Sequence, residues 1–187
     1  EGAYYYLAAL WEQIFGESYT ALRLLSVWAG TLAVPLTMRL GRRMYSRRVG
    51  LLAAAGVSLS MWAIFYSRIG FRAVILPPLL LWTMNLFWDG LTRPAREHGT
   101  RRWLSFALVY ALSFYVYTAV RVLPFFFLLF GLYLLIWHRT VLQRKARPMA
   151  WSFVIAGLLV LPLLWTLVRL GGAGVRLEQV GNPLQAL

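Results

Sequence analysis

The sequence lacks cysteine and is poor in charge, and these two absences exclude several classes of protein. Without cysteine there is no disulfide framework, no thiolate nucleophile and no cysteine metal site. Charged residues make up 13% of the 187 positions, and only six of them are acidic. Such a chain has too little polar surface for a water-soluble helical domain, whose helices would show amphipathic stripes.

Long apolar blocks dominate the rest of the sequence. Hydrophobic residues account for 60% of the chain and the mean hydropathy is +0.64, and these residues form nearly uncharged blocks separated by short basic segments. A helix of ~20 apolar residues spans the hydrocarbon layer of a bilayer. We therefore predict an all-α fold in which residues 1–187 form a single transmembrane domain, a polytopic bundle of about six helices within residues 19–170.

The first segment, residues 2–15, is apolar but too short to span a bilayer. Gly16 follows it and is expected to stop the helix. We predict that residues 1–16 form a helix on the outer membrane surface, with aromatic side chains at the level of the lipid headgroups. These side chains are Tyr4, Tyr5, Tyr6 and Trp11.

The predicted spans follow from the remaining apolar blocks. They cover residues 19–41, 49–66 and 73–91, two helices within 103–137, and residues 149–168. Pro77 and Pro78 fall in the first turns of the third span, where a missing N–H does least harm. We place a tight outer turn near Arg121 and Pro124, and an outer polar segment at 171–187.

Basic residues indicate the orientation of the bundle. Of the 19 basic residues, 13 fall in three segments between predicted spans, at 39–48, 93–102 and 138–147. The positive-inside rule places these segments in the cytoplasm, so both ends of the chain are expected outside. A net charge of +13 would otherwise suggest nucleic-acid binding. The clustering instead indicates membrane lipids as partners and no nucleic acid.

Three arginines on the predicted outer side are unexpected under the same rule. Arg68 and Arg72 are four residues apart and would project from one face of a helix, and Arg121 lies at the same predicted depth. A guanidinium group presents a planar fork of donors suited to phosphate oxygens, so the three arginines predict a phosphate site. The alternative is that each extends to lipid headgroups or pairs with an outer carboxylate.

Aromatic and acidic residues near this level supply further candidates for substrate binding. Tyr115 and Tyr117 could stack on a sugar face, although aromatic residues at this depth also form an ordinary interfacial belt. Glu1 is a candidate outer-face carboxylate. His98 and His138 fall in predicted cytoplasmic loops, and no histidine and carboxylate spacing indicates a metal site. We predict no cofactor, while the need for a divalent cation is undecided at this stage.

Four segments resemble a known family in their order and spacing. They are FGESYTALRLLS at 15–26, GRRMYSRRVGLLA at 41–53, YSRIGFRA at 66–73 with Pro77, and YVYTAVRV at 115–122 with Pro124. Together they resemble the integral-membrane glycosyltransferases of the GT-C superfamily, in particular glycosyltransferase family 39, the dolichyl-phosphate-mannose protein mannosyltransferase-like group and its bacterial relatives. The resemblance covers nearly the whole sequence.

The resemblance implies a transferase that passes a sugar from a polyprenyl-phosphate carrier to a lipid, glycan or protein acceptor on the outer face of the bacterial plasma membrane. An acidic residue of the first outer loop would deprotonate the acceptor hydroxyl for attack with inversion. Cationic side chains would stabilise the departing phosphate, a role we expect for Arg68, Arg72 and Arg121. The family's Asp-Glu pair would precede Glu1, so we expect an internal fragment without the catalytic base.

Two other classes of function are compatible with the residues. A transporter or flippase for an anionic or lipid-linked substrate would line a path with the same arginines and would carry polar groups at mid-membrane depth. Thr83 and Asn85 are the polar residues well inside the third span, and neither is ionisable. A non-catalytic membrane scaffold would leave the outer arginines without any role in transfer.

Overall fold

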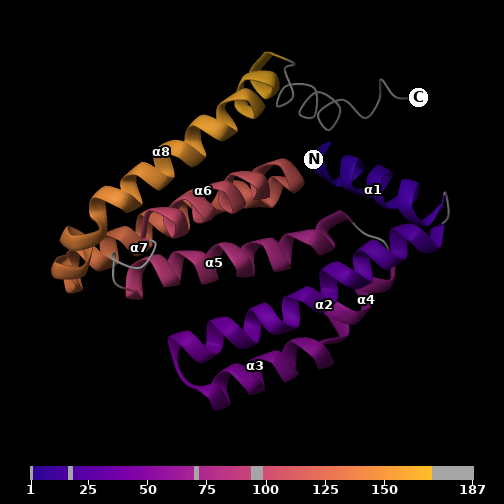
Figure 1. Ribbon diagram of the computed structural model, residues 1–187, viewed down its shortest axis with the longest axis horizontal. Helices are drawn as coiled ribbons and strands as arrows, with labels where there is room; N and C mark the ends of the chain where they lie inside the picture. Colours follow the sequence, from indigo (N-terminus) through magenta and orange to yellow (C-terminus); the bar gives the residue numbers. More distant parts are fainter. Residues whose placement is uncertain (1, 17–18, 70–71, 94–98, 170–187) are drawn as a thin grey trace, which may run out of the picture.

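The computed structural model describes residues 2–16, 19–69, 72–93 and 99–169, and every regular element within these ranges is a helix. The all-α prediction is therefore confirmed, and Figure 1 shows the helices as a bundle. The elements are α1 (Gly2–Phe15), α2 (Tyr19–Met44), α3 (Arg47–Leu59), α4 (Met61–Ile69), η1 (Arg72–Ile75), α5 (Leu76–Thr92), α6 (Gly99–Val116), η2 (Thr118–Val122), α7 (Leu123–Trp137) and α8 (Arg139–Arg169).

Four stretches of helix are long and apolar enough to cross a membrane, and the pair α3 and α4 makes a fifth if it is one bent span. The four stretches are Thr20–Met44, Ala73–Thr92, Thr118–Trp137 and Arg139–Thr166. The remaining predicted span corresponds to α6, which is helical but begins with Arg101 and Arg102 and does not reach the same length and hydropathy. The structure is thus a helical membrane bundle with four or five candidate spans.

The first helix has the predicted bounds. It ends at Phe15, and Gly16 follows with a φ of 87°, the left-handed conformation that terminates many helices and that glycine adopts without strain. Tyr4 and Ala8 on α1 are buried, because α1 packs against α2 and α6. One side of α1 therefore lies on the bundle, and its location at the membrane surface stays a prediction.

Helices α2 and α3 form a closely packed hairpin. Ser46 caps α3, where its hydroxyl accepts a hydrogen bond from the Val49 N–H at 3.3 Å. Gly41 and Gly50 let the two helices approach each other, since a Cβ at Gly41 would lie 2.8 Å from Gly50 Cα. Small residues at such a contact allow the close van der Waals packing that holds membrane helices together.

The second predicted span, 49–66, differs from expectation because it is broken. Helices α3 and α4 meet at an angle of 51°, and Ser60 between them has an extended backbone. Just before the break, the Ser58 hydroxyl donates to the Ala55 carbonyl at 2.9 Å. Such back-bonding competes with the helical ladder and bends helices. The break turns α4 away from the axis of α3.

The later elements follow the proline positions that the sequence suggests. Pro77 and Pro78 lie in the first turn of α5, and Pro124 lies in the first turn of α7. The 3₁₀ segment η2 carries Arg121 and separates α6 from α7, which confirms a turn near Arg121 and Pro124. Proline is tolerated there because the first N–H groups of a helix have no partner within the helix.

The basic segment 138–147 was predicted as a loop and this is wrong. Apart from His138, it forms the first turns of α8, which has 31 residues and is therefore ~46 Å long. This exceeds the ~30 Å hydrocarbon layer, so the first turns have room to project beyond it. The Leu, Gln, Arg, Lys and Ala residues of this segment favour helix over loop.

Two apolar clusters hold the bundle together. The larger is aromatic and joins α5, α6, α7 and α8 around the fully buried Phe106, whose ring packs against Phe87, Tyr110, Phe127 and Phe153. The smaller joins α1, α2, η1, α5 and α6 around Leu25, Ala29, Val74 and Val116. The second cluster fixes η1 and the end of α6, which form part of the candidate site.

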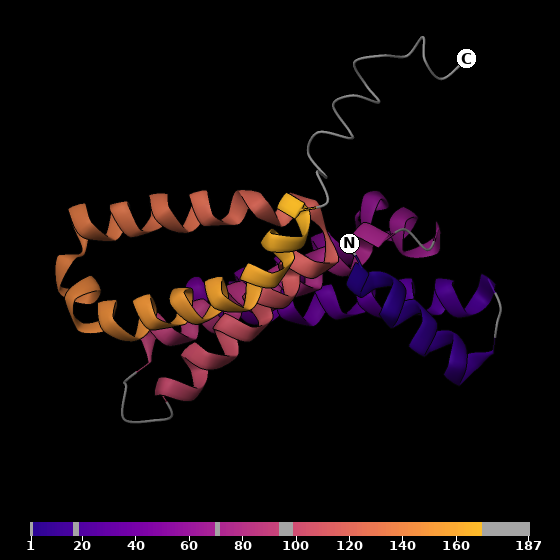
Figure 2. The ribbon, with the colours of Figure 1, turned by 90° about the horizontal axis from the view of Figure 1, so that it is seen from above.

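The turns of the bundle separate into two ends. The α2–α3 turn, the last residues of α5 and the α7–α8 junction all lie at the left in Figure 1, and Figure 2 agrees. We call this the basic end, because the three basic segments adjoin these turns. At the other end lie α1, η1, η2 and the last turns of α8. We call it the tyrosine end, after Tyr66, Tyr115 and Tyr117.

Candidate functional site

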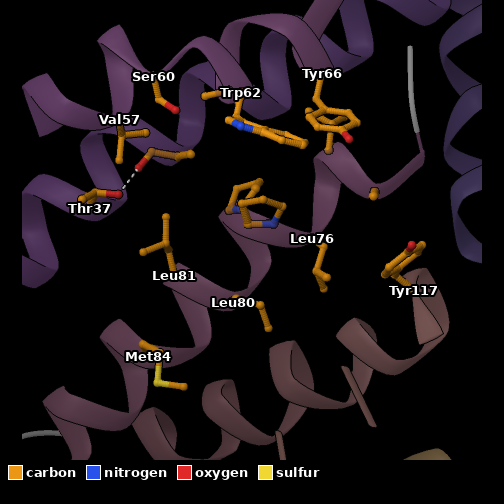
Figure 3. Close-up of a pocket in the computed structure, with 17 residues that line it drawn as sticks. Thr37, Val57, Ser60, Trp62, Tyr66, Leu76, Leu80, Leu81, Met84 and Tyr117 are labelled. Carbon is orange, nitrogen blue, oxygen red and sulfur yellow. Dashed lines mark hydrogen bonds between the residues drawn. The ribbon is translucent and has the colours of Figure 1, made fainter. Parts of the chain in front are cut away.

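A large apolar cavity lies between α2, α4 and α5 and reaches the tyrosine end (Figure 3). Its volume is about 860 Å³, within the range of small-molecule sites. Leu76 and Met84 line it on α5, and their spacing corresponds to a length of ~12 Å along that helix. The remaining lining residues are Gly30, Ala33, Thr37, Val57, Ser60, Trp62, Ala63, Tyr66, Ala73, Val74, Pro77, Pro78, Leu80, Leu81 and Tyr117.

The cavity exists because the elements around it are bent or carry small side chains. Ser60 at the α3–α4 break lines the cavity, and so do Gly30, Ala33 and Ala63. At Gly30 the helices touch, since a Cβ there would lie 3.0 Å from the Ser67 Cβ. The contact holds α4 against α2, while the break leaves space farther along the hairpin.

Polar side chains at the cavity are few, and they fall into two groups. Figure 3 shows Tyr66 and Tyr117 at the same end of the cavity, coming from α4 and from the residue before η2. Thr37 and Ser60 lie farther in. The Thr37 hydroxyl donates to the Ala33 carbonyl at 2.8 Å, so it is used within its helix. A long apolar group with one polar terminus would therefore fit with its terminus beside the tyrosines.

Arg68 lines a second cavity at the tyrosine end. This cavity has a volume of about 380 Å³ and is lined by Arg23, Val27, Phe65, Arg68 and Ile69. Helix α4 separates it from the apolar cavity, because residues 62, 63 and 66 face one side and 65, 68 and 69 the other. The structure thus brings Arg68 next to Arg23, a residue that is not among the arginines selected from the sequence.

The other two predicted arginines lie on the 3₁₀ segments of the same end. Arg72 begins η1, which packs against α2, α4, α5 and α6, and its side chain lies outside the described residues. Arg121 is exposed on η2, which packs against α6 and α7. Arg121 lines neither of the two cavities. The three arginines thus lie on elements of the same end of the bundle. Their shared depth in the membrane and their joint binding of one phosphate stay predictions.

The two predicted tyrosines differ in their surroundings. The Tyr115 hydroxyl donates to the Leu159 carbonyl at 2.6 Å and so connects α6 to α8. Tyr117 lines the apolar cavity and packs against the smaller apolar cluster. Tyr117 is therefore the better placed of the two to touch a ligand. Glu1 lies outside the described residues, as does the predicted outer segment 171–187.

Helix α1 lies beside these groups at the tyrosine end. Tyr4 packs with Leu25 and Val116 in the smaller cluster, and burial raises the pKa of Tyr4, with smaller contributions from Tyr5 and Glu12. Trp11 packs against the same cluster, and its buried Nε1 has no acceptor among the described residues. Helix α1 thus forms a wall of the tyrosine end.

At the basic end the structure reveals a charged cluster that sequence reasoning missed. Asp89 on α5 is 5% exposed. It contacts Arg43, accepts a hydrogen bond from Arg39 at 3.2 Å, and lies 3.7 Å from Arg93. The sequence contains one indication of this cluster, since Asp89 is a single acidic residue in an apolar block and precedes Arg93 by four residues. A buried carboxylate requires partners, and arginines of two basic segments supply them.

The polar residues within the third span are used to join helices. Asn85 Nδ2 donates to the Leu36 carbonyl at 3.0 Å and the Leu81 carbonyl at 2.8 Å. The Thr83 hydroxyl donates to the Leu79 carbonyl at 2.8 Å. Neither residue lines the apolar cavity. The described residues contain no group of three or more metal-ligating side chains.

One comparison with known proteins gives a match. The model of the family described as dolichyl-phosphate-mannose-protein mannosyltransferase matches residues 3–168. No curated protein and no solved structure matches the chain. The matched range includes the two cavities, the tyrosine end and the basic end, and it confirms the resemblance seen in the sequence. The chain therefore belongs to the dolichyl-phosphate-mannose-protein mannosyltransferase family, a family of membrane glycosyltransferases.

Proposed function

We propose that the chain is the membrane part of a glycosyltransferase that takes a sugar from a polyprenyl-phosphate carrier at the tyrosine end. The apolar cavity between α2, α4 and α5 is the observation that carries this proposal. Its wall on α5 is apolar along ~12 Å, and Tyr66 and Tyr117 lie together at one end. A polyprenyl phosphate has the same division, with a long apolar chain and a charged head.

The cavity positions the carrier and contributes little to its affinity. A polyprenyl chain that moves from the bilayer into the cavity exchanges one apolar environment for another, so no hydrophobic gain accompanies the transfer. Selectivity must then come from the head, where charge and hydrogen bonds distinguish ligands. We therefore expect transfer to tolerate different chain lengths and to depend on residues of the tyrosine end.

Arginines are proposed to receive the phosphate. When the acceptor hydroxyl attacks the anomeric carbon, the bond from that carbon to the phosphate oxygen breaks and the lipid phosphate leaves with an additional negative charge. Fixed cationic donors stabilise such a charge. Arg72 on η1 adjoins the cavity residue Ala73. Arg68 and Arg23 line the adjacent cavity, where two like charges would favour a bound anion. Arg121 supplies a further cation on η2.

Aromatic residues are proposed to orient the sugar. Tyr117 and Tyr66 lie at the end of the cavity (Figure 3), and tyrosine side chains combine apolar contact with a hydrogen-bonding tip. Helix α1 would shape the entrance for the acceptor, which is a lipid, glycan or protein. We assign this end to the extracytoplasmic face, because the basic end satisfies the positive-inside rule.

The proposal is tested by sugar transfer in membranes that contain the full-length protein, with a radiolabelled polyprenyl-phosphate sugar as donor. Ala63→Trp places an indole in the apolar cavity, which Ala63 lines. Ala55→Trp is the matched control, because Ala55 is exposed in the neighbouring α3 and does not line the cavity. We expect Ala63→Trp to abolish most transfer and Ala55→Trp to preserve it. Equal activity of the two variants would contradict a carrier in this cavity.

Arginine variants test the head group in the same assay. Arg68→Ala, Arg72→Ala and Arg121→Ala should each lower kcat, by up to about 10²-fold for a residue that stabilises the leaving phosphate. Arg144→Ala at the basic end removes the same charge and should have no effect. Normal transfer by all three outer variants would remove the phosphate role. Movement of labelled lipid across the membrane without transfer would favour a flippase instead.

A further inference from the structure

A third cavity lies at the basic end, on the side of α2 that carries its last arginines. Its volume is about 400 Å³, and its lining residues are Pro35, Met38, Arg39, Arg42 and Arg43. These positions follow the helical spacing of i, i+3, i+4, i+7 and i+8, so they form one face of α2. The face is apolar in its first turn and cationic in its last turns.

The surroundings of this cavity carry an excess of positive charge. In the part of the chain that the structure describes, Asp89 is the carboxylate that contacts Arg39, Arg43 and Arg93, and one negative charge cannot balance three positive ones. Among the described residues, Arg42 has no ion-pair partner. An additional anion would therefore relieve repulsion within the cluster.

The arginines at the cavity are held in place before any ligand binds. Asp89 is 7% exposed at its side chain and fixes Arg39 and Arg43, whose side chains are 47% and 24% exposed. Trp88 Nε1 donates to the Arg43 carbonyl at 3.3 Å and connects α5 to the same turn of α2. Donors that are already ordered lose less entropy when they bind an anion. The partly exposed guanidinium groups still have donors for a ligand.

The cavity has an apolar part and a cationic part, the division that a phospholipid has between its acyl chains and its headgroup. Pro35 and Arg43 are eight residues apart on α2, which corresponds to ~12 Å along the helix axis. Arg42 and Arg43 belong to the last turn of α2, at the level where lipid phosphates lie if α2 spans the bilayer. Pro35 and Met38 lie one to two turns deeper, at the level of the acyl chains. A soluble anion would use only the cationic part.

We propose that this cavity binds the phosphate of an anionic phospholipid in the leaflet at the basic end. Arg42 and the exposed parts of Arg39 and Arg43 hold the phosphate oxygens, since guanidinium donors bind phosphate in a planar fork. The acyl chains lie against Pro35 and Met38. Clusters of basic residues at the cytoplasmic end of a membrane helix bind such headgroups. This site is separate from the proposed carrier cavity, which opens at the other end of the bundle.

The test uses the full-length protein, purified in a neutral detergent and titrated with phosphatidylglycerol or phosphatidylcholine while bound lipid is counted by native mass spectrometry. Arg42→Gln is the informative variant, because it removes a cation of the cavity without touching the contacts of Asp89. Arg47→Gln is the matched control, since Arg47 is exposed on α3 at the same end but does not line the cavity. Inorganic phosphate serves as a competitor.

We expect phosphatidylglycerol to bind more tightly than phosphatidylcholine, and Arg42→Gln to weaken it about fivefold, as one interfacial arginine would. Arg47→Gln should leave the affinity unchanged. Equal weakening by both variants would mean diffuse attraction to the basic end and would overturn the site. Displacement of phosphatidylglycerol by millimolar inorganic phosphate would also overturn it, because the cavity would then recognise a free anion. Thermal stability of Arg42→Gln equal to that of the wild type shows that folding is unaffected.

Discussion

The close contact between α2 and α3 leads us to predict opposite effects on stability when each of two glycines of α3 is replaced by alanine. In Gly50→Ala the new Cβ would lie 2.6 Å from the Met38 carbonyl oxygen and 2.7 Å from the Arg42 backbone nitrogen. In Gly56→Ala the new Cβ would meet nothing within 4 Å. Backbone atoms of α2 cannot rotate aside as a side chain can, so Gly50→Ala forces the helices apart.

The magnitude follows from a comparison of the two variants. Each replaces glycine by alanine within α3 and so gains ~0.5–1 kcal/mol of stability from reduced backbone entropy in the unfolded state. Only Gly50→Ala adds overpacking, which costs about 1–3 kcal/mol. The difference between the variants therefore isolates the steric cost. We expect Gly56→Ala to be at least as stable as the wild type and Gly50→Ala to be about 1–3 kcal/mol less stable than Gly56→Ala.

The assay is reversible unfolding in mixed micelles, followed by circular dichroism as the fraction of denaturing detergent rises. Both variants and the wild type are measured in the same micelles. The shared gain in backbone entropy cancels when the free energy of unfolding of one variant is subtracted from that of the other. A difference below ~0.5 kcal/mol, the usual size of a surface substitution effect, would refute the close packing of Gly41 and Gly50. Higher stability of Gly50→Ala than of Gly56→Ala would refute it as well.

Predictions for four further variants concern the ends of the bundle. Asp89→Asn should lower the free energy of unfolding by about 2–3 kcal/mol, because a buried charged acceptor loses its charge-assisted hydrogen bonds. Arg93 lies 3.7 Å from Asp89, and Arg93→Gln should lower the free energy of unfolding by less than ~1 kcal/mol. Unfolding in micelles checks both variants. Tyr115→Phe should cost ~1 kcal/mol for the lost bond to the Leu159 carbonyl while transfer per folded molecule is preserved. Tyr117→Phe should leave stability unchanged and reduce kcat/KM about tenfold in the radiolabel assay. Equal effects of the two tyrosine variants on transfer would contradict the placement of Tyr117, but not Tyr115, at the apolar cavity.

Much of the fold was predictable because each helix depends on local signals. The bounds of α1 follow from Gly16, and the starts of α5 and α7 follow from Pro77 and Pro124. The α3–α4 break was not predictable, since serine breaks a helix only in some surroundings. The early start of α8 was missed because a basic segment suggests a loop, although its residues favour a helix.

The candidate site was predictable only in part. Its place at one end of the bundle followed from Arg68, Arg72 and Arg121, which all fall on elements of the tyrosine end. The partner of Arg68 was not predictable, because Arg23 is distant in sequence and meets it only through the packing of α2 against α4. Each residue of α4 lines one cavity or the other according to the face of the helix on which it lies. Because α4 begins after the break at Ser60, the sequence alone does not show which way each face points.

By itself, the sequence determined that this protein is a helical membrane bundle with basic segments at one end, because hydropathy and charge act through the bilayer on each segment separately. Its ordered motifs also determined the family, which the match over residues 3–168 confirms. Only the tertiary structure decided that Asp89 is surrounded by Arg39, Arg43 and Arg93, and that an apolar cavity opens beside Tyr66 and Tyr117. Both features join residues of different helices, and their contacts depend on angles and close approaches that no local pattern of residues specifies.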